Sequence, residues 1–185
     1  MKINIAITGA SGSIYALKLL NFLLNIDYKI NLIISDNGYK VLEHECKGFK
    51  INHKNLQIHD NKNLCADIAS GSNKIKAMII IPCSMGSLAR IANGISNDLI
   101  SRSADICLKE KYQLIICPRE TPFNTIHLRN MLSLSQDGAV ILPCMPAFYH
   151  LPKSLDDISD FLCGKVLDIL NIKHELFKAW KEPSL

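Results

Sequence analysis

Short apolar runs separated by amphipathic segments recur along the whole chain. The runs are rich in isoleucine and mostly unbroken, which is typical of parallel strands that are buried on both faces. The candidate strands are residues 2–8, 29–34, 76–81, 113–117 and 139–142. Helical patterns follow them at residues 14–24, 37–46, 87–93, 98–109 and 125–135. Strands and helices in alternation predict a parallel sheet with right-handed crossovers and helices on both faces.

The last part of the chain predicts two further helices. Ser154 with Asp157 three residues later resembles a capping box, and apolar residues then recur at helical spacing as far as Ile169. A weaker helical pattern covers residues 173–180. Residues 50–70 are polar, and we expect a loop there with at most one strand. Because no repeat or linker is visible, we expect one α/β domain over residues 1–185, a three-layer Rossmann or flavodoxin-like fold.

Composition narrows the class of protein. The chain has 185 residues, of which 48% are apolar, and its net charge is +4 with the basic residues dispersed. Nucleic-acid binders usually show a basic stripe, so we expect no nucleic-acid partner. No apolar stretch approaches the roughly 20 residues that cross a bilayer, and the short run before Gly9 is too brief for a secretory signal. We therefore expect a soluble, cytoplasmic protein without a membrane partner.

Seven cysteines are scattered along the chain without a C-x-x-C or zinc-finger spacing, and the six histidines show no ligand spacing. We expect reduced thiols that pack as small core residues, including Cys83, and no metal.

Small and polar residues follow every candidate strand. In open parallel sheets the ligand lies outside the carboxyl ends of the strands, so these positions carry the functional information. The segments are residues 9–13, Ser35, residues 82–87, 118–122 and 143–149. Hydroxyls, glycines, an ion pair and a tyrosine are thereby directed to one rim.

The turn 9–13 has two glycines that let the backbone approach a ligand closely, and the amides of the following helix attract an anion. We expect a phosphate there. The alternative is a plain tight turn capped by Ser11 or Ser13, and the second small-residue loop at 84–87 favours the ligand site. The pattern lacks the ending of a P-loop and the complete G-x-G-x-x-G, so ATP and NAD fit poorly.

Charged residues near the strand ends have a functional and a plain interpretation. Arg102 and Lys109 share a helix face, which a solvated charged surface would also explain. Arg119 and Glu120 follow an apolar strand and are held between two prolines. Lys165 falls in an apolar helical stripe, where a lysine either extends to the edge or meets an anion.

Two aromatic residues have equally open roles. Tyr149 is either a core aromatic residue with its hydroxyl at the surface or a ligand contact, and Trp180 is either an anchor of a terminal helix or part of a site.

An ordered series of motifs carries a family resemblance. The motifs are residues 8–12, 34–35, 69–72, 82–84, 102–105, 108–110, 118–122 and 146–150. In this order they resemble the UbiX-type flavin prenyltransferases, from residue 3 to about residue 180.

The resemblance implies a flavodoxin-like protein that uses reduced FMN as the acceptor of a dimethylallyl group, supplied as dimethylallyl monophosphate. The group joins N5 and C6 of the flavin, without a metal, and the prenylated FMN serves a UbiD-type decarboxylase, as in ubiquinone biosynthesis. The resemblance also implies a homo-oligomer, commonly a dodecamer, with sites at subunit junctions that the C-terminal residues 154–180 complete.

The resemblance assigns roles position by position. FMN would be held by Gly9, Ala10, Ser11, Ser35, Ser84, Met85, Gly86, Ser87 and Arg102. The prenyl phosphate would contact Lys109, Arg119, Tyr149 and Lys165. The catalytic set would be Ser11, Glu45, Lys109, Arg119, Glu120 and Trp180. Two positions depart from the family pattern, because Lys165 replaces an arginine of many relatives and Leu64 an aromatic residue of some.

Three other functions fit the sequence less well. A flavin-dependent decarboxylase of a cysteine-containing substrate has the same fold, but its histidine and its Asn/Met-rich substrate motif are not found here. A flavin electron carrier would have no use for the cations Lys109, Arg119 and Lys165. A dinucleotide-binding dehydrogenase is disfavoured because this chain lacks the complete G-x-G-x-x-G fingerprint.

Overall fold

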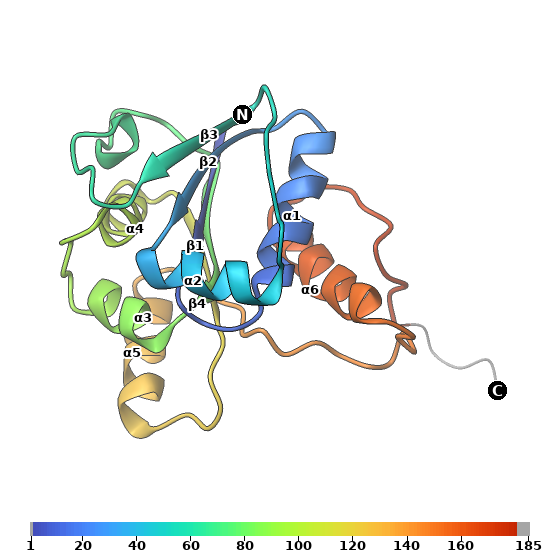
Figure 1. The fold of residues 1–185 in the computed structure, drawn as a ribbon. Coiled ribbons are helices and arrows are strands. Elements are labelled where there is room, and N and C mark those ends of the chain that lie inside the picture. Colours follow the sequence, from blue (N-terminus) through green and yellow to red (C-terminus); the bar gives the residue numbers. More distant parts are fainter. Residues whose placement is uncertain (1, 181–185) are drawn as a thin grey trace.

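A parallel sheet of six strands runs through the molecule, and the computed structural model describes residues 2–180 (Figure 1). The strands are β1 (Lys2–Ile7), β2 (Lys29–Ile34), β3 (Leu56–Asp60), β4 (Ala77–Cys83), β5 (Gln113–Pro118) and β6 (Val140–Ile141). Their order is β3-β2-β1-β4-β5-β6, and all neighbours are parallel. Without the edge strand β3 this is the order of flavodoxin-like sheets.

Helices cover both faces of the sheet (Figure 1). They are α1 (Ser13–Asn25), α2 (Asp36–Glu45), α3 (Met85–Ala92), α4 (Leu99–Glu110), α5 (Thr125–Gln136) and α6 (Leu155–Ile169), with a short 3-10 turn η1 (Asp67–Ala69). Helices α1 and α6 pack together on one face, while α3, α4 and α5 lie on the other. The predicted three-layer α/β fold is confirmed.

Burial on both faces explains the unbroken apolar strands. In β1, Ile3, Ile5 and Ile7 belong to the core on the α1 and α6 side, whereas Ala6 belongs to the core on the opposite side. Strand β4 is buried along its whole length. A fully buried isoleucine side chain contributes roughly 1.5–3 kcal/mol, so alternation with polar residues would destabilise these strands.

One polar line interrupts this core. The Nδ2 of Asn31 in β2 donates to the Oδ1 of Asn4 in β1 at 2.8 Å, and the Oδ1 of Asn31 lies 3.2 Å from the Nε2 of His59 in β3. Burial lowers the pKa of His59, and Lys2 lowers it further while Asp67 opposes them. The neutral imidazole and the two amides therefore satisfy one another inside the sheet.

The predicted helix over residues 173–180 is wrong, since no helix is present there. The backbone N–H of Leu176 donates to Nδ1 of His174 at 3.2 Å and not to a carbonyl one turn earlier. Eight residues are also too few to form a helix without support. The segment instead packs along α6, where the rings of His174 and Phe177 occupy the space that a Cβ at Gly164 would need.

Candidate functional site

The ends of β1 and β4 are tied together by one threonine. The hydroxyl of Thr8 donates to the carbonyl of Pro82 at 2.9 Å and accepts from the N–H of Ser84 at 2.7 Å. The sheet order reverses between these two strands, which is where doubly wound sheets bind ligands. The turn 9–13 and the loop 84–87 therefore lie side by side, as the sequence predicts.

The glycines of the turn 9–13 are required by its geometry. A Cβ at Gly9 would lie 2.7 Å from the Cβ of Asn37, so the turn approaches the start of α2 closely. Gly12 has φ +107°, a left-handed conformation that other residues rarely adopt.

The amides of this turn do attract an anion, but that anion comes from within the chain. The carboxylate of Glu45 accepts from the N–H of Gly12 at 3.0 Å and from the N–H of Ser13 at 2.8 Å. Gly12 offers no side chain to cap α1, so a carboxylate from the end of α2 does so. An acid 33 residues away in the chain takes the place that we predicted for a phosphate.

Glu45 is ionised by its partners. Burial raises its pKa, but hydrogen bonds from the Ser11 side chain and from the amides of Ser13 and Gly12 outweigh burial, so that the pKa lies below its usual value. The Nε of Arg119 donates to the carbonyl of Ser11 at 3.2 Å. The structure thus brings Ser11, Glu45 and Arg119 to one place.

Two residues beside this place were missed by the sequence analysis. Burial raises the pKa of Tyr15, with Cys144 acting in the same direction and Arg119 in the opposite one. Burial raises the pKa of Cys144 to about 12, again opposed by Arg119. Arg119 is therefore close to both side chains. A tyrosine at the second position of a predicted helix gives no sequence signal of its own.

The starts of α2 and α3 are capped by serines. The Oγ of Ser35 accepts from the N–H of Gly38 at 3.0 Å, and the Oγ of Ser84 accepts from the N–H of Ser87 at 3.4 Å. A Cβ at Gly86 would meet nothing within 4 Å, so the backbone borders open space at this one position of the first turn of α3, whereas Met85 and Ser87 are buried. Such helix starts suit an anion.

Arg102 and Lys109 do not join this group. Arg102 donates to the carbonyl of Ala69 at 3.3 Å and pairs with Asp105 at 3.0 Å. Lys109 pairs with Glu110. Helix α4 runs back from the carboxyl end of the sheet, so Lys109 in its last turn lies toward the amino end, near the start of β5.

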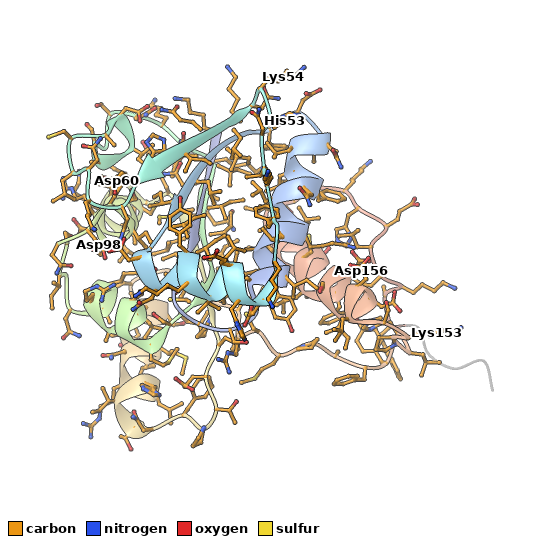
Figure 2. All side chains as sticks on the ribbon, viewed as in Figure 1. His53, Lys54, Asp60, Asp98, Lys153 and Asp156 are labelled. Carbon is orange, nitrogen blue, oxygen red and sulfur yellow. The ribbon has the colours of Figure 1, made fainter. Side chains whose placement is uncertain are left out.

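Three of the remaining predicted residues lie on or beside α6, namely Tyr149, Lys165 and Trp180, whereas Glu120 lies in the loop after β5. The rings of Tyr149 and Trp180 meet edge to face with centroids 5.5 Å apart. Lys165 extends to the surface and pairs with Asp168 at 3.1 Å. Glu120 accepts from the N–H of Thr121 at 3.0 Å. Figure 2 shows Lys153 and Asp156 at the start of α6, on the opposite flank from Asp60 and Asp98.

The thiols are mostly, but not all, core residues. Four cysteines are buried: Cys83, Cys107, Cys117 and Cys163. Cys65 is exposed, which corrects the prediction for that residue. Among residues 2–180, no group of three or more metal-ligating side chains is placed to hold an ion, and no helix there is long and apolar enough to span a bilayer.

Sheets of this order bind ligands at the switch point, and the hydroxyls and helix starts here suit an anionic mononucleotide. The fold and the rim thus define the class, a mononucleotide-binding α/β protein. A family model described as Flavoprotein matches residues 1–168. A flavin prenyltransferase UbiX of Methanocaldococcus jannaschii is 49% identical over 185 residues, covering 97% of this chain and 98% of the relative.

Solved structures agree with this result. A UbiX (PadA1) protein in complex with FMN and dimethylallyl pyrophosphate is 35% identical, with a TM-score of 0.92 over 99% of this chain and 98% of the other. A dodecameric FMN-dependent UbiX-like decarboxylase from Escherichia coli O157:H7 is 36% identical, with a TM-score of 0.93 over 98% and 100%. The chain belongs to the Flavoprotein family and, within it, to the UbiX-type flavin prenyltransferases.

A peptidyl-cysteine decarboxylase shares only the fold, at 18% identity and a TM-score of 0.60 over 92% of this chain and 98% of the other.

Proposed function

We propose that this protein transfers the dimethylallyl group of dimethylallyl monophosphate to N5 and C6 of reduced FMN. The observation that carries the proposal is the meeting of Ser11, Glu45 and Arg119 at the switch point, in a chain that matches flavin prenyltransferases over nearly its full length. Reduced FMN supplies the nucleophilic atoms, and the chain supplies binding, charge and proton transfer.

The flavin phosphate belongs at the first turn of α3. The α1 amides already bind Glu45, and the first turn of α2 contains Asp36. The first turn of α3 contains no acid and includes Ser84, Met85, Gly86 and Ser87. Gly9, Ala10, Ser11 and Ser35 then line the flavin from the neighbouring strand ends.

Arg119 and the other cations act on the prenyl phosphate. Breaking the allylic C–O bond leaves extra negative charge on the departing phosphate, so a cation aimed at it stabilises the transition state more than the ground state. Each 1.4 kcal/mol gained in this way is about tenfold in rate. Arg119, Lys109, Tyr149 and Lys165 are the donors that we assign to this phosphate.

The two acids have separate tasks. Glu45, held ionised beside Ser11, is the group that we assign to accept a proton near the reacting flavin. Glu120 next to Arg119 moves a proton between flavin and phosphate. Trp180, in contact with Tyr149, forms one side of the pocket for the allyl tail. Burial of this tail yields about 0.8 kcal/mol per carbon, which is too little to bind the substrate tightly without the phosphate contacts.

The site requires a second copy of the chain. Arg119 lies at the carboxyl end of the sheet, whereas Lys109 lies toward its amino end. One chain therefore cannot bring both cations to the same phosphate. A homo-oligomer in which the α4 end of one copy meets the rim of the next would do so, and a dodecamer is the form that we propose.

We further propose that a UbiD-type decarboxylase receives the prenylated FMN, and that the transfer takes place in the cytoplasm.

The reaction is tested by mixing the protein anaerobically with chemically reduced FMN and either the monophosphate or the diphosphate of dimethylallyl alcohol. Absorbance and product mass are then followed. A flavin that gains one five-carbon unit supports the proposal, and an unchanged flavin with both donors refutes it. Loss of carbon dioxide from a cysteine-containing peptide would favour the decarboxylase alternative.

The shared site is tested with two inactive variants. Lys109→Ala is expected to bind FMN normally without turnover, and Arg119→Ala is also expected to be inactive. If each site takes Lys109 and Arg119 from different copies, unfolding and refolding the two variants together restores activity at a fraction of the sites. Inactive mixed oligomers would contradict the shared site without contradicting the reaction.

A further inference from the structure

Ser87 has a hydroxyl proton with no acceptor. Its side chain is in the first turn of α3, and the residue is only 5% exposed. Its Oγ accepts from the Oγ of Ser84 at 3.1 Å and from Nη2 of Arg90 at 3.1 Å. A serine hydroxyl has two acceptor positions and one donor. Both acceptor positions are used, and within residues 2–180 no group accepts the proton of Ser87.

Arg90 determines this arrangement. A guanidinium only donates, so Ser87 must accept from it. The same Nη2 lies 3.2 Å from Oδ2 of Asp98, whose other oxygen accepts from the N–H of Ser101 at 2.8 Å. Figure 2 shows Asp98 on the α4 side of the sheet. The capping box of α4 therefore fixes Arg90, and Arg90 fixes Ser87.

The positive charge of Arg90 is neutralised by its ion pair with Asp98. Because Asp98 neutralises the guanidinium at close range, little net positive charge remains to attract a distant anion. The effect of Arg90 is instead transmitted through the orientation of one hydroxyl.

We propose that Arg90 is a positioning residue that turns the Ser87 O–H toward the flavin phosphate, and so selects FMN over riboflavin. The inference rests on the proposed function, because it takes the loop 84–87 as the phosphate site. A hydrogen bond to a charged oxygen is among the stronger ones, and its acceptor exists only in the phosphorylated flavin.

The test is a double-mutant cycle read with two flavins. Oxidised FMN and riboflavin are titrated into the wild type, Arg90→Met, Ser87→Ala and the double variant. We expect each single variant to bind FMN about tenfold more weakly, as loss of a hydrogen bond to a charged group predicts, and riboflavin within about twofold of the wild type. The double variant is expected to lose no more than Ser87→Ala.

Two further variants separate positioning from general damage. Arg90→Lys keeps a donor to Ser87 and is expected to retain most of the FMN affinity. Arg129→Ala removes an exposed arginine on α5 and is the matched charge control. Equal weakening for FMN and riboflavin, or additive losses in the double variant, would overturn the proposal. A wild type that binds neither flavin would instead contradict the proposed function.

Discussion

The capping of α1 by Glu45 leads to a quantitative prediction for Glu45→Ala. Losing a helix cap destabilises a protein by about 0.5–2 kcal/mol, and losing a charge beside the helix dipole adds roughly 0.3–1 kcal/mol. Glu45 is exposed, so solvent screens the charge contribution. We therefore expect a loss of about 1–2 kcal/mol, or about 2–8 °C in Tm for a chain of this length.

The lowered pKa of Glu45 determines how the stabilisation by this residue changes with pH. The folded-state pKa of Glu45 lies below its usual value. Its stabilisation is then fully present above the ordinary glutamate pKa of about 4.3 and is lost as the pH falls through the lower folded value. The stability difference between wild type and Glu45→Ala should be largest near pH 7 and disappear at strongly acidic pH.

The assay is thermal and urea unfolding of both proteins across this pH range. Glu43→Ala is the control, since Glu43 is an exposed acid on the same helix. If Glu45→Ala is as stable as Glu43→Ala at pH 7, or if their difference does not depend on pH, the carboxylate does not cap α1.

Two more predictions concern buried contacts. Gly164→Ala adds a Cβ where the rings of His174 and Phe177 lie, so residues 173–180 can no longer pack on α6. We expect turnover to fall at least tenfold while the flavin affinity measured by titration stays unchanged. Normal turnover would show that the reaction does not need this packing. Asn31→Ala leaves His59 and the buried Asn4 without their hydrogen-bond partner. Urea unfolding should show that the free energy of unfolding falls by about 2–3 kcal/mol. A loss under about 1 kcal/mol would mean that water replaces the amide of Asn31.

Much of the fold could be predicted because it depends on local patterns. Unbroken isoleucine runs indicate strands that are buried on both faces. Ser154 and Asp157 indicate the start of α6, where they form the predicted capping box. The clustering of the loops after β1 and β4 also followed from the rule that parallel strands end at one edge.

Other features depend on pairings between distant residues. Glu45 reads as one more exposed acid at the end of a helix, and only the packing of α2 beside the turn 9–13 reveals it as a cap. Residues 173–180 have helical spacing of their apolar residues, but the contacts of His174 and Phe177 with α6 stabilise a non-helical conformation instead. Arg90 also lies on an ordinary amphipathic helix, and the positioning role that we propose for it depends on its ion pair with Asp98 at the start of the next helix.

The placement of Glu45 changes the meaning of the glycine-serine turn. A turn of this kind attracts an anion, and α1 obtains its anion from within the chain. In the site that we propose, the phosphate therefore binds at α3, where no acid competes, and not at α1. The carboxylate at α1 is meanwhile held ionised between Ser11 and the positive helix end, at the rim that Arg119 also reaches. The backbone geometry of this turn thus binds the carboxylate of Glu45, to which we assign a proton-accepting role in the proposed reaction.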